Sequence, residues 1–202
     1  MITAEDQIRL AEAIRDAESR TAGEIVVVVA QEASHYRSIP ILWALLMALA
    51  IPWPLIALTA LGPTRIFQVQ LLVALAMSVF LSLPKRRFSL VPRFIKHARA
   101  REAAAREFLR RGLTRTRDKT GVLIYVAMGE HYAEILADAG IADRVDADLW
   151  RDIIRDLTGA IGDGRSVDGL MGAVERSGAI LAEHAPPRPG DEDELPNKVI
   201  LL

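Results

Sequence analysis

The chain has 202 residues, a formal net charge of -1 and no cysteine, and 51% of its residues are hydrophobic. The near-neutral charge argues against nucleic acid as the main partner, because binding to phosphate groups requires a basic surface. The lack of cysteine excludes disulfides, cysteine nucleophiles and metal sites with thiolate ligands.

The N-terminal segment predicts a soluble helix followed by a buried strand. Charged residues recur through residues 1–20, whereas a secretory signal needs an uncharged apolar run. Thr3 and Asp6 have nearly the spacing of a capping box and place the helix start there. Residues 24–30 then include four consecutive valines, which favour a strand. Because this run is apolar without alternation, we expect a central strand covered on both faces.

Residues 39–84 predict a helical hairpin that crosses a membrane twice. Ile39 to Leu61 and Phe67 to Pro84 contain no charged residue, and about 20 apolar residues span the hydrocarbon core as a helix. Gly62 to Arg65 form a tight turn, so the helices are antiparallel. Pro52 and Pro54, inside the first segment, are expected to kink it. The alternative is a buried hairpin of a soluble protein, but such core helices rarely lack a polar face over this length.

Basic residues flank the hairpin and predict its orientation. Lys85, Arg86 and Arg87 follow it directly, whereas the turn between its helices carries only Arg65. The positive-inside rule therefore places the soluble part of the chain in the cytoplasm. We expect a multi-pass protein of the inner (plasma) membrane that has the lipid bilayer as a partner. The basic run could also contact anionic headgroups, beyond its role in setting topology.

Helices separate the strands that the rest of the sequence predicts. The second predicted strand is strongly apolar, whereas the third alternates only loosely, which suits an edge strand and would also permit a helix. The C-terminal tail is proline-rich and acidic and should be mobile, and it ends in an apolar stretch whose partner surface the sequence does not name. The expected helices are residues 94–113, 143–158 and 166–181, and the expected strands are 121–128 and 132–138.

This order of elements predicts a three-layer α/β/α domain. Residues 1–38 and 85–185 together form that domain, since both halves are needed to complete the sheet. The transmembrane hairpin at 39–84 interrupts it, and residues 186–202 form the tail. The hairpin is therefore an insertion within one domain.

Four stretches of the sequence carry a resemblance to a known family: residues 21–28, 120–126 and 130–141, and Gly162–Gly164 with Gly169–Leu170. They are similar to the TPM domain family. The resemblance implies a Rossmann-like α/β/α fold and a bacterial membrane branch with an inserted transmembrane hairpin. It also implies two possible activities, because some plant members of the thylakoid lumen are described as acid phosphatases and other members as binding divalent metal through acidic loops. Many bacterial members have no established activity.

The sequence lacks the motifs of the better-defined enzyme classes. It has no Walker loop, dinucleotide-binding glycines, zinc-protease motif or nucleophile elbow. It also lacks the aspartate nucleophile motif of a phosphatase, so a phosphatase here would need a metal-activated water.

The best candidate site consists of Glu130, His131 and Asp138, with Glu24 as a further member. The first two follow the second strand and Asp138 ends the third, and such strand ends are where α/β sheets bind ligands. Carboxylates with an imidazole could hold Mg²⁺ or Ca²⁺, or a softer ion through His131. His131 could instead act as an acid or base. Alternatively, Glu130 and His131 are ordinary loop residues and Glu24 forms a salt bridge. Many members of the family have a glycine where Asp138 stands.

A second acidic group is better explained by helix formation. Asp143, Asp146 and Asp148 have the spacing of a first helical turn, where carboxylates interact favourably with the helix dipole. The spacing and the closing glutamate of an EF-hand calcium loop are absent from the sequence.

These observations favour a binding or scaffolding module that acts on membrane-protein partners, or that forms a homo-oligomer. The alternative is a divalent-metal-dependent phosphatase of the TPM type, which rests on the resemblance alone. A purely structural subunit is a third option.

Overall fold

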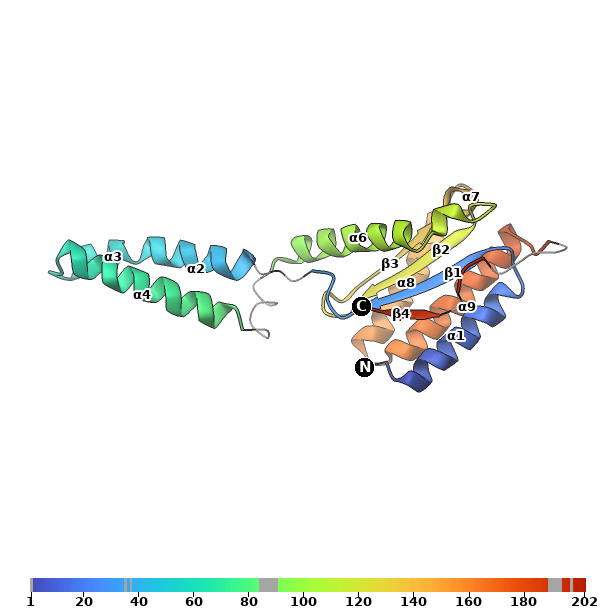
Figure 1. The fold of residues 1–202 in the computed structure, drawn as a ribbon, viewed down its shortest axis with the longest axis horizontal. Coiled ribbons are helices and arrows are strands. Elements are labelled where there is room, and N and C mark those ends of the chain that lie inside the picture. The colour runs from blue at the N-terminus through green and yellow to red at the C-terminus, as the bar shows by residue number, and fades with distance from the viewer. Residues whose placement is uncertain (1, 35, 37, 84–90, 189–193, 197) are drawn as a thin grey trace. The chain divides into compact units, whose positions relative to one another are not determined.

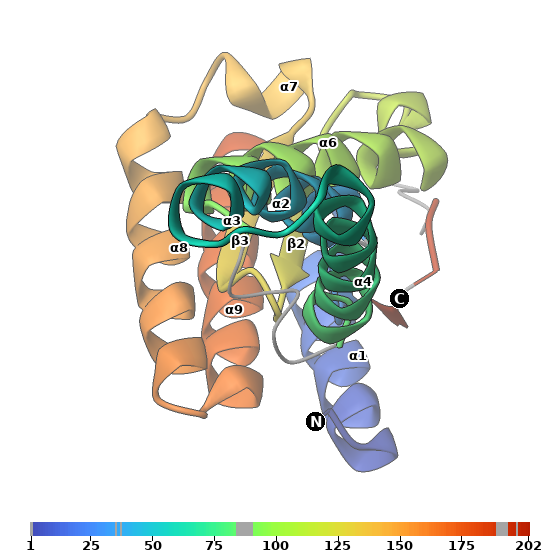
Figure 2. The same ribbon diagram turned by 90° about the vertical axis from the view of Figure 1, so that its left-hand side faces the viewer.

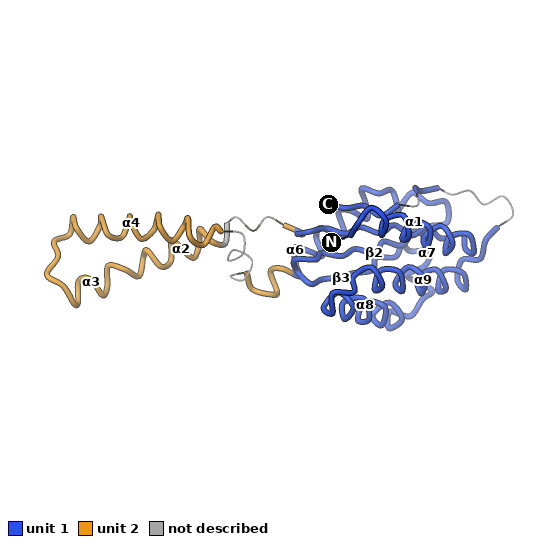
Figure 3. Tube along the Cα trace, turned by 90° about the horizontal axis from the view of Figure 1, so that it is seen from below, with its two compact units in different colours: residues 1–33, 97–202 blue, residues 34–96 orange. Residues whose placement is uncertain are grey.

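The computed structural model describes residues 2–34, 36, 38–83, 91–188, 194–196 and 198–202. The chain divides into two compact units, residues 1–33 with 97–202 and residues 34–96 (Figure 3). The first unit contains a four-stranded sheet and the second contains the apolar hairpin. The predicted α/β domain with an inserted hairpin is therefore confirmed, whereas residues 189–193 of the tail lie outside the described residues.

The sheet has the strand order β3-β2-β1-β4 (Figure 1). β1 (Glu24–Ala30) and β2 (Gly121–Ala127) are parallel neighbours along their whole length. β3 (Tyr132–Ala137) pairs antiparallel with β2, and β4 (Val199–Leu201) pairs parallel with β1.

Every residue of β1 and β2 is buried, which explains their unbroken apolar sequence. Successive side chains of a strand point to opposite faces of the sheet. Val27 and Ile124 accordingly belong to one hydrophobic core, and Val28 and Leu123 belong to the other. A strand with a core on each side has no polar face, as the sequence predicted.

Helices cover both faces of the sheet and give it three layers (Figures 1 and 2). One core forms under α1 (Ala4–Glu18), α8 (Ala147–Gly162) and α9 (Ser166–His184). The opposite core forms under α6 (Arg93–Arg110). Short helical turns complete the unit, at η1 (Leu113–Arg115) before β2 and at α7 (Ala139–Ala142) after β3.

The two outer strands differ in how far the sequence predicted them. β3 is an edge strand, so the strand prediction for residues 132–138 is confirmed and the helical alternative is wrong. β4 was not predicted as a strand. It is the apolar C-terminal stretch, and it pairs with β1 as the outermost strand on the side of the sheet opposite to β3. Val199 lies beside Val27 in this pairing.

The hairpin occupies the crossover between β1 and β2. Parallel neighbours cannot be joined by a tight turn, so the chain must leave the sheet and return before β2. Here that connection contains α2 (Ser38–Ala50), α3 (Pro52–Leu58), α4 (Pro63–Leu81) and then α6.

Two segments of the hairpin are long and apolar enough to cross a membrane, Pro40–Leu58 and Pro63–Leu81, with 19 residues each. The first is interrupted at Ile51, directly before Pro52, where the prolines predicted a kink. The second begins before the predicted Phe67. Its predicted end, Pro84, is not among the residues described.

The packing of the hairpin leaves its large side chains facing outward. On α2, Ala44 and Ala48 are buried, and small residues four apart allow helix backbones to approach closely. Trp53 and Leu58, by contrast, are 79% and 82% exposed, as are many other large apolar residues of the hairpin to lesser degrees. So much contiguous apolar surface is suited to lipid rather than to water.

Two interactions, one at each end, position α1 in the soluble unit, which is residues 1–33 with 97–202. Thr3 and Asp6 form the predicted capping box, in which the side chain of each accepts a hydrogen bond from the backbone N–H of the other. At the other end of the helix, α1 crosses α9 at Ala17 and Gly178. A Cβ atom added to Gly178 would lie only 2.6 Å from the Cβ of Ala17.

We expect Gly178→Ala to destabilise the soluble unit by about 1–3 kcal/mol, because the added methyl forces α1 away from α9. Thermal unfolding of the full chain in detergent, followed by circular dichroism, measures the effect. Gly172→Ala is the matched control on the same helix, since its Cβ would meet nothing within 4 Å. That variant should gain up to about 1 kcal/mol from helix propensity. Equal effects of the two variants would contradict the close crossing.

Candidate functional site

The structure divides the four predicted site residues between opposite edges of the sheet. Glu130 and His131 lie in the turn after β2, at the carboxyl edge of the parallel strands. Glu24 begins β1, and the N–H of Asp138 donates to the carbonyl of Gly121, so both lie at the amino edge. A seven-residue strand is roughly 20 Å long. The four residues therefore do not form one site, and residues 2–34, 36, 38–83, 91–188, 194–196 and 198–202 contain no cluster of three acidic or histidine residues that could hold a metal.

The separation follows from the direction of β3. A single site at the ends of the second and third strands would require the two strands to run in the same direction. Because β3 is antiparallel to β2, its end at Asp138 returns to the amino edge. This corrects the expectation of a single combined site, while a metal role for any one of these residues stays a prediction.

Glu130 is buried and holds the segment that follows β1. Its Oε1 accepts a hydrogen bond of 3.0 Å from the N–H of Ala33. His131 is exposed and has a φ of 50°, a left-handed conformation that occurs in tight turns. Its N–H donates to the carbonyl of Met128. Both residues therefore form hydrogen bonds that stabilise the segments following β1 and β2.

At the amino edge the two carboxylates also bond to backbone. Asp138 caps α7, with Oδ1 accepting from the N–H of Ala139 at 2.8 Å. Oε1 of Glu24 accepts from the N–H of Glu194 at 2.9 Å, which ties the segment before β4 to the start of β1. Of the second acidic group, Asp146 caps α8 and Asp148 lies in its first turn, as expected, whereas Asp143 instead ends α7.

Two tyrosines on the α6 side of the sheet keep their protons at neutral pH. Burial raises the pKa of Tyr125 to about 12, and the charges of Glu130 and Glu107 add to the effect. Burial also raises the pKa of Tyr132, whose hydroxyl donates to Glu134 at 3.0 Å. Both hydroxyls therefore stay protonated near pH 7 and cannot act as bases there, and that of Tyr132 serves as a hydrogen-bond donor.

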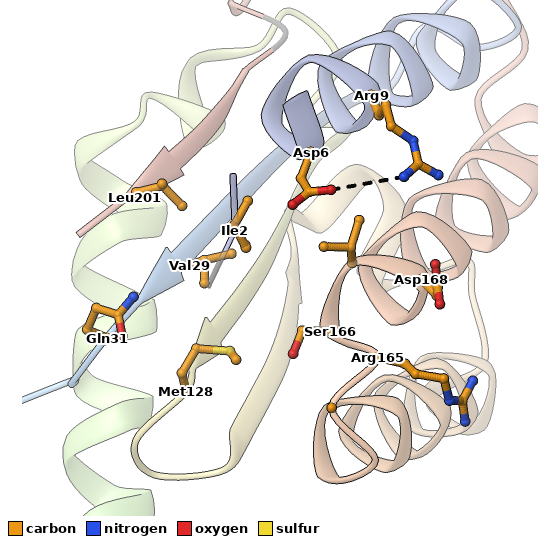
Figure 4. Close-up of a pocket in the computed structure, with 12 residues that line it drawn as sticks. Ile2, Asp6, Arg9, Val29, Gln31, Met128, Arg165, Ser166, Asp168 and Leu201 are labelled. Carbon is orange, nitrogen blue, oxygen red and sulfur yellow. Dashed lines mark ion pairs between the residues drawn. The ribbon is translucent and has the colours of Figure 1, made fainter. Parts of the chain in front are cut away.

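A pocket of about 580 Å³ lies at the carboxyl edge of the sheet, on the side of α1 and α9 (Figure 4). Its floor comes from the ends of the three parallel strands, and its walls from the first turns of the two helices. Its lining includes the apolar side chains of Val29, Met128 and Leu201 and the polar side chains of Gln31, Asp6, Arg9, Arg165, Ser166 and Asp168.

Charges of both signs line this pocket. Asp6 and Arg9 of α1 form an ion pair at 4.0 Å, and the guanidinium of Arg165 pairs with Asp163 at 2.8 Å. Hydrogen bonds from the backbone and side chain of Thr3 hold the pKa of Asp6 below its usual value, so this carboxylate is ionised. The first turn of α9, with N–H groups that have no partner within the helix, adds positive potential.

Such a pocket can bind a segment that carries both apolar and charged groups. Its place at the carboxyl ends of parallel strands is where α/β folds bind ligands. The sequence predicted the loop at Gly162–Gly164 and the start of the following helix, but no motif in it marked them as part of a pocket. The parallel order of β1 and β2 predicts that Gln31 and Met128 share an edge. The convergence of α1 and α9 on that edge is a tertiary feature.

Comparison with known proteins identifies the soluble unit. Residues 87–180 match the family model described as the TPM domain. The chain contains a TPM domain. The match includes the pocket residues of α9 and Met128, whereas α1 and β1 lie before it. α1 and β1 belong to the same compact unit as most of the matched region, although the hairpin separates them from it in the sequence.

A solved structure supports the same fold. The NMR structure of BA42 protein from the psychrophilic bacterium Bizionia argentinensis is similar, with a TM-score of 0.62 and 23% sequence identity. The similarity covers 100% of this chain and 95% of that chain. None of the curated proteins matches the chain in sequence.

Alkaline pH should destabilise the TPM domain through Tyr125. Its pKa is raised on folding, so the unfolded chain releases the proton near pH 10 and the folded chain near pH 12. The stabilising contribution is complete below pH 10 and is lost as the pH rises to 12. We expect Tyr125→Phe to show a shallower fall in melting temperature over this range, measured by circular dichroism. Identical slopes for the two proteins would contradict the assignment.

Proposed function

We propose that this protein is a membrane-anchored binding module whose TPM domain faces the cytoplasm and holds a segment of a membrane-protein partner. The observation that carries the proposal is the hairpin of two apolar, outward-facing helices within the β1–β2 crossover. An anchor built into the fold, rather than appended at a terminus, keeps the soluble domain at the bilayer.

The pocket at the carboxyl edge is the proposed binding site. Six residues separate Gln31, which lines the pocket, from Ser38, where α2 begins. A connection of that length spans at most about 25 Å. A partner in the same membrane is therefore within reach of the pocket. Its mixed lining suits an extended polypeptide that offers an apolar side chain to Met128 and a charged one to Arg165 or Asp168.

The cytoplasmic orientation rests on the basic flank of the hairpin. Lys85, Arg86 and Arg87 follow α4 in the sequence, whereas Arg65, in the first turn of α4, is the only charged residue in residues 38–83. Positively charged flanks are retained on the cytoplasmic side of the inner membrane.

Photo-crosslinking in intact cells tests the binding proposal. A photoreactive residue at Gln31 of the full chain should form adducts with integral membrane proteins, and Ser166→Trp should abolish them by filling the pocket. The same photoreactive residue at Thr114, exposed on η1 near the amino edge, should give none. Equal adducts from both positions, or adducts that survive Ser166→Trp, would refute the pocket as the binding site.

The same cells report orientation and serve as the folding control. Because the chain has no cysteine, Gly62→Cys introduces a single thiol in the turn between the apolar helices. A membrane-impermeant thiol reagent added outside the cells should label it. Protection of this thiol in intact cells would reverse the proposed orientation. An unchanged melting temperature of Ser166→Trp separates loss of binding from loss of fold.

A divalent-metal-dependent phosphatase is the second candidate function, because the family model that matches residues 87–180 is named for a phosphatase. The purified full chain is assayed with p-nitrophenyl phosphate and Mg²⁺ or Ca²⁺, with and without EDTA. We expect no turnover that EDTA removes. Metal-dependent turnover would favour the phosphatase, and comparing Glu130→Ala with Asp138→Ala would show which edge of the sheet carries it.

A further inference from the structure

The helix that follows the hairpin has one face on the sheet and a very different face toward solvent. Its residues Ala100, Ala103, Ala104 and Glu107 are buried. Five residues at intervals of three or four form an exposed stripe on the opposite side, which we call the outer stripe. They are Phe94, Ala98, Glu102, Ala105 and Leu109. Phe94 and Leu109, the two large apolar members of the stripe, are 73% and 66% exposed.

Arginines border the outer stripe on both sides. With 100° between successive residues, Arg101 lies along one side, and Arg99, Arg106 and Arg110 lie along the other. All four are exposed. The one acidic member of the stripe, Glu102, is paired with Arg99 at 3.0 Å. Over its whole length α6 carries six arginine or lysine residues against two glutamates.

We propose that the outer stripe of α6 lies on the surface of an anionic membrane. Large apolar side chains between cationic borders are the pattern of a helix in the interfacial plane, with its apolar side chains among the acyl chain ends and its cations on phosphates. α6 begins twelve residues after α4 ends at Leu81, and the intervening sequence adds Lys85, Arg86 and Arg87. The inference rests on the membrane anchoring proposed above, and the cytoplasmic leaflet supplies the anionic lipid.

A second copy of the chain fits this face less well. A helix–helix seam needs large apolar residues at most of its positions, whereas three of the five stripe positions are alanine or glutamate. Two copies would also bring their bordering arginines together, and like charges repel. Anionic headgroups instead neutralise both borders.

The experiment uses the full chain with Leu109→Cys as its only cysteine, labelled with an environment-sensitive fluorophore. The protein is reconstituted singly into nanodiscs of phosphatidylcholine, with or without phosphatidylglycerol. We expect phosphatidylglycerol to shift the emission to shorter wavelength and to make it sensitive to a quencher carried on the lipid. Leu109 is the informative position, because it lies at the end of α6 far from the hairpin in sequence.

Matched variants separate a charge effect from a general one. Arg99→Gln with Arg106→Gln should return the emission to its value in pure phosphatidylcholine. Arg155→Gln with Arg176→Gln removes two exposed arginines from α8 and α9, on the other face of the sheet, and should leave the shift unchanged. Equal loss in both pairs would overturn the proposal.

Two further results distinguish failure of the inference about α6 from failure of the proposed membrane anchoring. A fluorophore at Leu72→Cys, in the middle of α4, should report an apolar environment in both lipids. If it does while the Leu109 probe stays solvated with phosphatidylglycerol, the inference about α6 is wrong and the anchor stands. If the Leu72 probe is itself solvated, the anchoring proposal fails. A Leu109 shift that ignores lipid charge and grows with the number of copies per disc would assign this face to a second copy.

Discussion

The parallel pairing of β1 with β2 is the constraint on which the rest of the structure depends. Each strand is buried on both faces, so the domain needs helices on either side of the sheet. Parallel neighbours also require a long connection, and this chain uses that connection to carry two apolar helices. The hairpin is thus part of the crossover connection that joins the two central strands of the sheet. The domain cannot close until the chain has returned from the hairpin.

The same pairing determines where chemistry can be located. The carboxyl ends of three parallel strands meet the first turns of α1 and α9 and leave a pocket with charges of both signs. The antiparallel β3 returns Asp138 to the opposite edge. The acidic residues that look close in sequence therefore have separate local tasks. Glu130 forms a hydrogen bond with the segment that follows β1, and Asp138 caps the short helix α7.

The hairpin and α6 both expose large apolar side chains, which the packing of the sheet does not require. The large side chains of the hairpin face outward, as lipid-exposed helices do. The helix that leads back to the sheet is cationic and carries Phe94 and Leu109 on its exposed face. If the proposed lipid contact of α6 holds, the membrane is contacted by the anchor and by the domain itself.

Local sequence patterns alone determined the central strands, the capping box at Thr3 and Asp6, and the two apolar segments. In each case the signal lies within one element, as an unbroken valine run, a fixed spacing or a charge-free stretch. Tertiary structure decided the direction of β3, the pairing of β4 beside β1 and the pocket at Arg165 and Asp168. These features depend on which edges and helix ends meet in space. A short edge strand such as Val199–Leu201 gains its conformation from the strand it joins, so its own sequence carries too little information to reveal it.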